Sequence, residues 1–462
     1  MIPENENGSH AADALKLGRS VGLLGGIALV VGGVIGMGIY ALIAAVGAQA
    51  GTGLWVAFLL AIFISGVGVA PLIQIVSALP RAGGGYLFTS RLLHPLIGTL
   101  ASCWAIFGGT CMTAMVALGL AGYIAPYLPG SPPVRLVAFV LPILFYTLFL
   151  FGLRLAASVQ MLLVAQLIVA LLVYGLSGAF SFDLSLAVDM PRGIDGLIMA
   201  TILCYSVCMG FQVIAEMGEE IKTPRRNIPL ALVIGGSIVL LVYILVGTVF
   251  INSLPYDFNS IGALTAPLMD SGKRFLSGFW VLFLSIGALS AGLTSFNAGA
   301  IALPRELLAQ ARDGILPRFL ERVHPRTRTP LNAVTVYFVL MLALILTGRS
   351  IDFYGVVTAV GILMMTATIS IAAVRLPNKF PRAYAKAYFH IPRGWLIILA
   401  AVSVVSSLGF VFIVTVEMPA AGLIYVILSL AVAVYYFLRV RWLKHTGVDW
   451  ERRVLTVPGD DG

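Results

Sequence analysis

Two glycine-rich interruptions inside long apolar stretches are the first candidates for chemistry. The first stretch carries Gly32-Gly33-Val34-Ile35-Gly36-Met37-Gly38-Ile39-Tyr40, and a later one carries Cys204-Tyr205-Ser206-Val207-Cys208-Met209-Gly210-Phe211. A helix within a bilayer breaks only where the loosened peptide groups face protein, water or a ligand. We therefore expect a buried set of free N–H and C=O groups at each interruption.

Such peptide groups suit a zwitterion. The start of a half-helix presents free N–H groups and the positive end of a dipole, which stabilise a carboxylate. Freed carbonyl groups accept hydrogen bonds from an ammonium group. Interrupted helices at matching positions in two halves of a chain predict a substrate site near the membrane midplane. Alternatively, the glycines only permit close helix packing, and the pattern by itself leaves both interpretations open.

The elements that position these residues are transmembrane helices. The chain has 462 residues, of which 60% are hydrophobic and 11% charged. A soluble surface needs more charge than that, and about 20 apolar residues cross a hydrocarbon core. Twelve apolar stretches are predicted spans: roughly 21–45, 53–78, 97–126, 134–152, 156–180, 194–217, 229–252, 276–308, 331–347, 352–374, 394–416 and 419–438.

The spacing of the two interruptions predicts an internal repeat. We expect an all-α membrane protein of twelve transmembrane helices, built as a five-plus-five inverted repeat with broken helices 1 and 6. Repeat one covers about 21–180, repeat two about 194–374, and two extra C-terminal helices about 394–438, so that the transporter-like domain runs over 21–438. The remaining segments, 1–20 and 439–462, are expected to be cytoplasmic tails.

The basic residues predict the orientation. If the N-terminus is cytoplasmic, nearly all of the 29 Lys and Arg residues lie on that side. The exceptions are Arg135, Arg192, Lys273, Arg274 and Arg349. This segregation follows the positive-inside rule and favours an even number of spans with both termini cytoplasmic. The net charge of +9 therefore reports orientation, and we expect no nucleic-acid partner.

Metal and enzyme chemistry have little support. Cys103, Cys111, Cys204 and Cys208 all fall in apolar stretches, where cysteine behaves as a small hydrophobe. The sequence has no His-Glu-x-x-His and no Gly-x-Ser-x-Gly pattern. We therefore expect no catalytic residue, no metal, no cofactor and no enzyme activity. No obligate protein partner is evident beside the lipid bilayer.

Four segments resemble the amino acid–polyamine–organocation family of permeases. They are Gly32–Tyr40, Leu79–Tyr86, Gly210-Phe211 followed by Glu219–Pro229, and Asn297 with Arg305 and Ala311–Pro317. Each segment alone is weak, but the four occur in order and at the expected spans, over roughly residues 20–375. The resemblance implies the five-plus-five fold and transport by alternating access.

The resemblance also implies residue roles. The backbone N–H groups of Met37 and Gly38 would hold a substrate carboxylate, and the carbonyls of Val34, Ser206 and Met209 would hold its amino group. The other residues expected around the pocket are Gly36, Ile39, Tyr205, Gly210 and Phe211. Family members often place an aromatic gate where this chain has Ser206, so that the pocket is roomier here or Tyr205 acts as the gate.

The coupling residues depart from the family pattern. Proton-coupled members often have a lysine in helix 5, where Gln166 is the nearest polar residue here, and some have an acidic residue where Gln212 stands. Glu216 lies one turn beyond Gln212 and is either a protonation or cation site or a rim residue paired with an arginine such as Arg225. Hydroxyls in span 8 offer a Na⁺ site or, alternatively, bond back to their own helix; they belong to Ser290, Thr294 and Ser295.

The function expected from this resemblance is secondary active transport. The substrate would be an amino acid, neutral by preference, or a related amine, moved as a symporter with H⁺ or Na⁺ or as an exchanger. The location would be a plasma membrane of a prokaryote, crossed many times. A membrane amino-acid sensor or a polyamine or organocation exchanger on the same fold remains the alternative. The charge-dense loops 219–227 and 305–328 would serve as a gate or as anchors to lipid headgroups.

Overall fold

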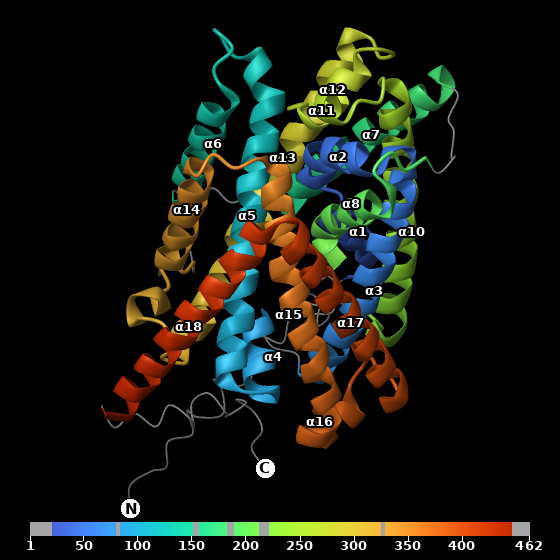
Figure 1. Ribbon diagram of the computed structural model, residues 1–462. Helices are drawn as coiled ribbons and strands as arrows, with labels where there is room; N and C mark the ends of the chain where they lie inside the picture. Colours follow the sequence, from blue (N-terminus) through green and yellow to red (C-terminus); the bar gives the residue numbers. More distant parts are fainter. Residues whose placement is uncertain are drawn as a thin grey trace, which may run out of the picture.

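The computed structural model is an assembly of helices (Figure 1), which confirms the predicted all-α membrane class. It describes residues 21–79, 84–150, 157–182, 189–211, 221–324 and 329–445. Within these ranges no strand forms, and a single isolated bridge pairs Val21 with Ile221. Helices satisfy their backbone groups internally, which is the condition for crossing a membrane.

Eight helical runs in the described ranges are long and apolar enough to cross a membrane. One run joins α2 (Met37–Ala50) to α3 (Leu54–Ala78) through a 3₁₀ turn at Gly51–Gly53. The other seven contain α5 (Pro95–Ile124), α7 (Ala157–Ser181), α10 (Pro224–Ser253), α13 (Gly278–Arg312), α15 (Ile351–Lys379), α17 (Arg393–Glu417) and α18 (Pro419–His445).

Shorter helices complete the assembly. Four are apolar and have 10–17 residues: α1 (Leu23–Val34), α6 (Val134–Leu150), α8 (Gly193–Val207) and α14 (Leu331–Leu346). Four more, which the sequence did not predict, lie in connections: α4 (Gly84–Leu92), α11 (Phe258–Gly262), α12 (Pro267–Gly272) and α16 (Pro381–Lys386). α18 runs to His445, so that it extends seven residues past 438, the end of the last predicted span.

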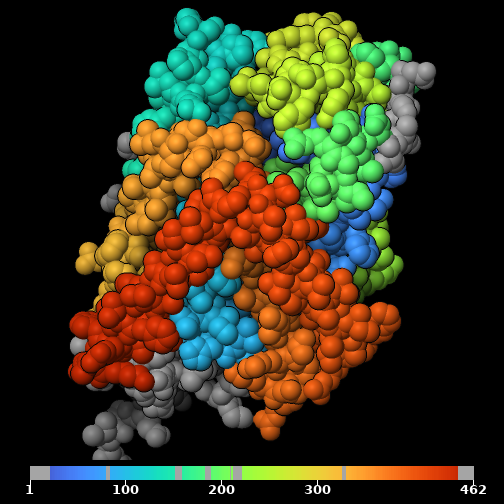
Figure 2. All heavy atoms as spheres, in the orientation of Figure 1, coloured from blue at the N-terminus to red at the C-terminus, as the bar shows by residue number. Residues whose placement is uncertain are grey.

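Helices α5 and α15 form the buried centre and pack against each other. α10 packs against α1 and α3 on one side, α8 packs against α2 and α3, and α13 and α7 pack together on another side. α17 and α18 cross the outside of the bundle (Figure 2), and many of their apolar side chains are exposed. An apolar outer face is what contact with lipid requires.

Contacts between distant segments define the two ends of the bundle. At the lower end in Figure 1, where α4 and α16 lie, Lys379 Nζ donates to the Arg91 carbonyl at 3.1 Å and Arg225 donates to the Ala387 carbonyl at 3.1 Å. At the upper end, near α11 and α12, Arg274 donates to the Ser253 carbonyl at 2.7 Å. Basic side chains therefore tie helix ends together at both faces.

Candidate functional site

The first predicted interruption is a real break between two helices. α1 ends at Val34, and α2 begins at Met37. Between them Ile35 (φ −75°, ψ 100°) and Gly36 (φ −140°, ψ −157°) are extended. Val34, Ile35 and Met37 are at most 2% exposed. The peptide groups released by the break are thus enclosed by protein, as a break at membrane depth requires.

The second interruption lies later in its stretch than the sequence indicated. Cys204, Tyr205 and Ser206 still belong to α8, which ends at Val207. A 3₁₀ turn, η4, follows over Cys208–Phe211. The amide of Cys208 donates to the Tyr205 carbonyl, which tightens the end of the helix. Residues 212–220 lie outside the described residues.

The two interruptions touch through their backbones. A Cβ built on Gly210 would overlap the carbonyl carbon and oxygen of Gly33 and the amide nitrogen of Val34. A Cβ on Gly38 would lie 2.6 Å from Val207 Cγ1. Glycine at these two positions permits the close packing that was the alternative interpretation. Here the packing and the break occur together, because the close contact is made at the break itself.

Tyr243 of α10 lies at the first break, and sequence reasoning did not select it. Its hydroxyl donates to the Val34 carbonyl at 3.0 Å, and the side chain is fully buried. The Val34 carbonyl, expected to hold an amino group, therefore already has one partner. A carbonyl oxygen has two lone pairs, so a second donor can be accepted. A tyrosine inside an apolar span was the only available signal.

The start of α2 faces α13. The Met37 amide donates a long hydrogen bond of 3.5 Å to Ser295 Oγ. The first N–H groups of a helix have no partner within the helix, and a bond of this length is weak. The Met37 N–H group at the start of α2 therefore has only a weak partner.

Tyr205 points toward α3 and α15. Its hydroxyl donates to Thr366 Oγ1 at 3.5 Å, and it lines a cavity of about 10 Å³ together with Ser65, Gly68, Val69, Cys208, Ile362 and Thr366. A cavity of this volume holds about one water molecule. The described contacts hold Tyr205 at this cavity, on the side of α8 that faces α3 and α15.

The remaining expected pocket residues lie near the breaks. Ile39 and Phe211 are at most 3% exposed. The hydroxyl of Ser206 donates to the Leu203 carbonyl at 2.7 Å, so that it bonds within its own helix. Met209 belongs to η4, and its side chain is outside the described residues.

The coupling candidates are dispersed. Gln166 Nε2 of α7 donates to the Phe283 carbonyl of α13 at 3.1 Å. Thr294 Oγ1 donates to the Ser290 and Ala291 carbonyls, both at 3.0 Å, as the back-bonding alternative predicted. Ser290 is buried nearby on the same helix. Glu216 and Gln212 both lie outside the described residues.

The arrangement has a clear chemical capacity. It combines N–H groups at the start of α2 with carbonyl oxygens at the ends of α1 and α8, inside a buried crossing of two interrupted segments. Within the described residues, no group of three or more His, Cys, Asp or Glu side chains converges as metal ligands would.

Comparison with known proteins gives consistent matches. The sequence model of a family described as amino acid permease matches residues 21–435. The branched-chain amino acid permease BcaP of Bacillus subtilis is 25% identical over 86% of this chain and 90% of its own length. An uncharacterized transporter of Mycobacterium tuberculosis is 28% identical over 78% and 81% of the two chains. The vacuolar cationic amino acid transporter 4 of Arabidopsis thaliana is 26% identical over 71% and 58%.

Proposed function

Since the chain belongs to the amino acid permease family, we propose that it is a secondary active transporter that moves an amino acid across a membrane by alternating access. The observation that carries the proposal is the buried break at Ile35–Gly36, placed against the end of α8. A ligand that enters this crossing would meet the Met37 amide, which has only a weak partner, and the second lone pair of the Val34 carbonyl.

The substrate is held at both of its charged ends. The N–H groups of Met37 and Gly38, aided by the dipole of the 14-residue α2, bind the carboxylate. The second lone pair of the Val34 carbonyl and the carbonyls of Ser206 and Met209 accept from the ammonium group. Ile39, Tyr205 and Phe211 shape the space around the substrate side chain, and Gly36 and Gly210 keep the backbones accessible.

A neutral amino acid fits this site best. The described side chains at the breaks are apolar or carry a hydroxyl or a thiol, and a second cationic group on the substrate would be buried without a counter-charge. One matching relative is named a branched-chain amino acid permease and another a cationic amino acid transporter. The apolar surroundings favour the first type of substrate.

The full architecture is proposed to contain twelve spans. α1 and α2 have 12 and 14 residues, about 18 and 21 Å at 1.5 Å per residue, so together they cross the membrane as one broken span. α8 with η4 would be its counterpart in the second half. The inverted repeat of spans 1–5 and 6–10 then relates the two breaks, and α17 and α18 are the additional pair.

The lower end in Figure 1 is proposed to be cytoplasmic, with both termini on that side of a prokaryotic plasma membrane. At this end Lys379 donates to the Arg91 carbonyl and Arg225 donates to the Ala387 carbonyl. The basic residues there outnumber those on the connections near α11 and α12, in line with the positive-inside rule. Transport is coupled to H⁺ or Na⁺, or is an exchange.

Uptake into proteoliposomes tests the proposal. Each of the common L-amino acids, radiolabelled, is offered with and without a pH gradient or a Na⁺ gradient. We expect accumulation of a neutral amino acid that depends on one gradient or on a counter-substrate inside. Binding without accumulation would indicate a sensor, and accumulation of diamines alone would indicate an organocation exchanger. Either result would overturn the proposal.

A further inference from the structure

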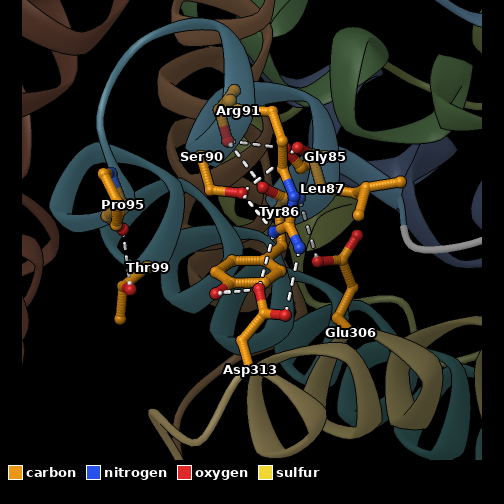
Figure 3. Close-up of polar contacts among 10 residues, drawn as sticks. Gly85, Tyr86, Leu87, Ser90, Arg91, Pro95, Thr99, Glu306 and Asp313 are labelled. Carbon is orange, nitrogen blue, oxygen red and sulfur yellow. Dashed lines mark hydrogen bonds and ion pairs between the residues drawn. The ribbon is translucent and has the colours of Figure 1, made fainter. Parts of the chain in front are cut away.

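A buried ion pair joins the short helix α4 to the end of α13 (Figure 3). The guanidinium of Arg91 contacts the carboxylate of Asp313 twice, with Nη1–Oδ2 at 2.6 Å and Nη2–Oδ1 at 3.0 Å. The two side chains are 6% and 11% exposed. A bidentate pair of this kind fixes orientation as well as distance.

Tyr86 adds two further bonds from α4 to α13. Its hydroxyl donates to Asp313 Oδ2 at 2.7 Å, and its backbone N–H donates to Glu306 Oε2 at 3.2 Å. Burial and the neighbouring Asp313 carboxylate raise the pKa of Tyr86 well above its ordinary value. The phenol therefore stays protonated and continues to donate. Glu306 and Asp313 are seven residues apart, two turns along α13, so α4 is attached at two levels.

Two more helices join the same cluster. Ser102 Oγ of α5 donates to Glu306 Oε2 at 2.6 Å, and Gln310 Nε2 donates to Ser102 Oγ at 2.9 Å. Lys379 at the end of α15 donates to the Arg91 carbonyl at 3.1 Å. α4 is thus bound to α5, α13 and α15 together. We call these residues the α4 cluster: Tyr86, Arg91, Ser102, Glu306, Gln310, Asp313 and Lys379.

The position of α4 along the chain indicates which parts of the molecule the α4 cluster connects. α3, just before α4, packs against α8, η4 and α10, the helices around the two breaks, and also against α15 and α17. α4 shares the contact with α15 and packs in addition against α5 and α13. Between α3 and α4 the chain therefore passes from the helices around the breaks to α5 and α13, while α15 contacts both α3 and α4. Alternating access requires movement between two such groups, and α4 marks where the second one begins.

The charges of the cluster argue for a lasting attachment. Arg91 and Asp313 form a buried ion pair, and Glu306 is a second buried carboxylate. Lys379, in contrast, is exposed and contacts the Arg91 carbonyl. Separating a buried pair would leave uncompensated charge on both sides, and connected hydrogen-bond networks reinforce each bond. A gate that opened in every cycle would meet this penalty each time. A gate was one of the two roles predicted for segment 305–328, and the buried ion pair in the α4 cluster argues against that role.

We propose that Arg91, Asp313 and Tyr86 are positioning residues that clamp α4 permanently to the α5–α13–α15 group. In this role the clamp transmits the relative movement of the two groups during transport. It sets the turnover rate and leaves the affinity for the substrate unchanged. This inference rests on the proposed transport function.

Uptake kinetics of matched variants test whether the clamp sets the turnover rate and leaves the substrate affinity unchanged. With an equimolar mixture of radiolabelled L-amino acids as probe, Asp313→Asn should lower the maximal uptake rate by about tenfold or more, because Arg91 loses its counter-charge. Equilibrium binding of the mixture to purified protein should stay within about twofold. Asp270→Asn, which breaks the exposed pair with Lys273, should change neither quantity.

A milder pair of variants covers the case in which Asp313→Asn does not fold. Tyr86→Phe removes only the hydroxyl bond to Asp313 and should lower the maximal rate several-fold. Its control is Tyr435→Phe, which removes a 2.9 Å bond to the Ile315 carbonyl outside the cluster and should have no effect. A wild-type maximal rate in folded Tyr86→Phe, or in folded Asp313→Asn, would overturn the proposal.

Spin-label distances separate a clamp from a gate. Labels at His94→Cys and Arg312→Cys, both exposed positions beside α4 and at the end of α13, should keep one distance with and without the amino acid mixture. Labels at His94→Cys and Arg226→Cys, on α10, span the two groups and should change distance. The four native cysteines are replaced beforehand. A His94–Arg312 distance that lengthens in either state would show a gate and refute the clamp.

Failure of the clamp and failure of the transport function give different results. If wild-type protein takes up no amino acid, the proposed function fails. Hydrogen exchange of the α4 amides does not depend on transport, and its rate reports directly how firmly α4 is held. Asp313→Asn should speed exchange at Gly84–Leu92 and leave α11 and α12 unchanged. Equal exchange at α4 in folded wild type and variant would overturn the clamp even in an active transporter.

Discussion

Replacing Gly210 by alanine should separate the two helix breaks and abolish tight substrate binding. The added methyl group would overlap three backbone atoms of Gly33 and Val34. Carbon atoms in ordinary contact are about 3.5–4.0 Å apart, so the segments would have to part by more than about 1 Å. Backbone atoms have no rotamer by which to move aside. Overpacking typically costs 1–3 kcal/mol, and we expect the upper end, about 3 kcal/mol.

If the two segments must come together each time the substrate binds, this cost is subtracted from the binding free energy. A cost of about 3 kcal/mol then corresponds to a loss of about a hundredfold in the binding constant. The assay is equilibrium binding of a labelled amino acid to purified protein, with thermal melting as a folding control. Gly38→Ala, which meets only the Val207 side chain, should lose less, about tenfold.

The matched control is Gly66→Ala in α3, where the new methyl group would meet no atom within 4 Å apart from its own helix backbone and chain neighbours. It should bind like wild type and melt at the same or a higher temperature, because alanine favours a helix. Folded Gly210→Ala with wild-type affinity would refute the placement of the site at the crossing.

Three further changes probe individual groups at the site and the coupling. Tyr243→Phe removes the donor to the Val34 carbonyl and should destabilise the substrate-free protein by about 1–2 kcal/mol. Substrate should then raise the melting temperature more in the variant than in wild type. An equal rise in both proteins would argue against the Val34 carbonyl as a substrate ligand. Ser295→Ala removes only a 3.5 Å bond and should alter binding less than about fivefold, whereas a complete loss of Na⁺-driven uptake would place an ion there. Glu216→Gln should abolish any rise of uptake with external acidity if Glu216 carries the coupled proton, and an unchanged pH profile would exclude that role.

The sequence predicted the first break because its signal is local. Gly32, Gly33, Gly36 and Gly38 cluster within a single apolar stretch, and the structure breaks the helix at Ile35–Gly36. The second signal was weaker. Cys204–Val207 contains no glycine and stays helical, and the 3₁₀ turn begins only two residues before Gly210.

The contacts that the sequence missed connect residues far apart along the chain. Tyr243 and Val34 are separated by 209 positions, and Arg91 and Asp313 by 222. Helical periodicity and apolar stretches identify elements but not which elements pack together. Asp313 lies in one segment of the family resemblance and Arg91 lies five residues after another, so the sequence marked both regions. Their pairing depends on the packing of α4 against α13, which no local pattern records.

A structure determined with a bound amino acid tests the central claim most directly. We predict the substrate carboxylate within hydrogen-bonding distance of the Met37 and Gly38 amides, and its ammonium group beside the Val34 carbonyl. An unbroken helix through residues 31–40, or a substrate seated away from the α1–α2 break, would contradict the account.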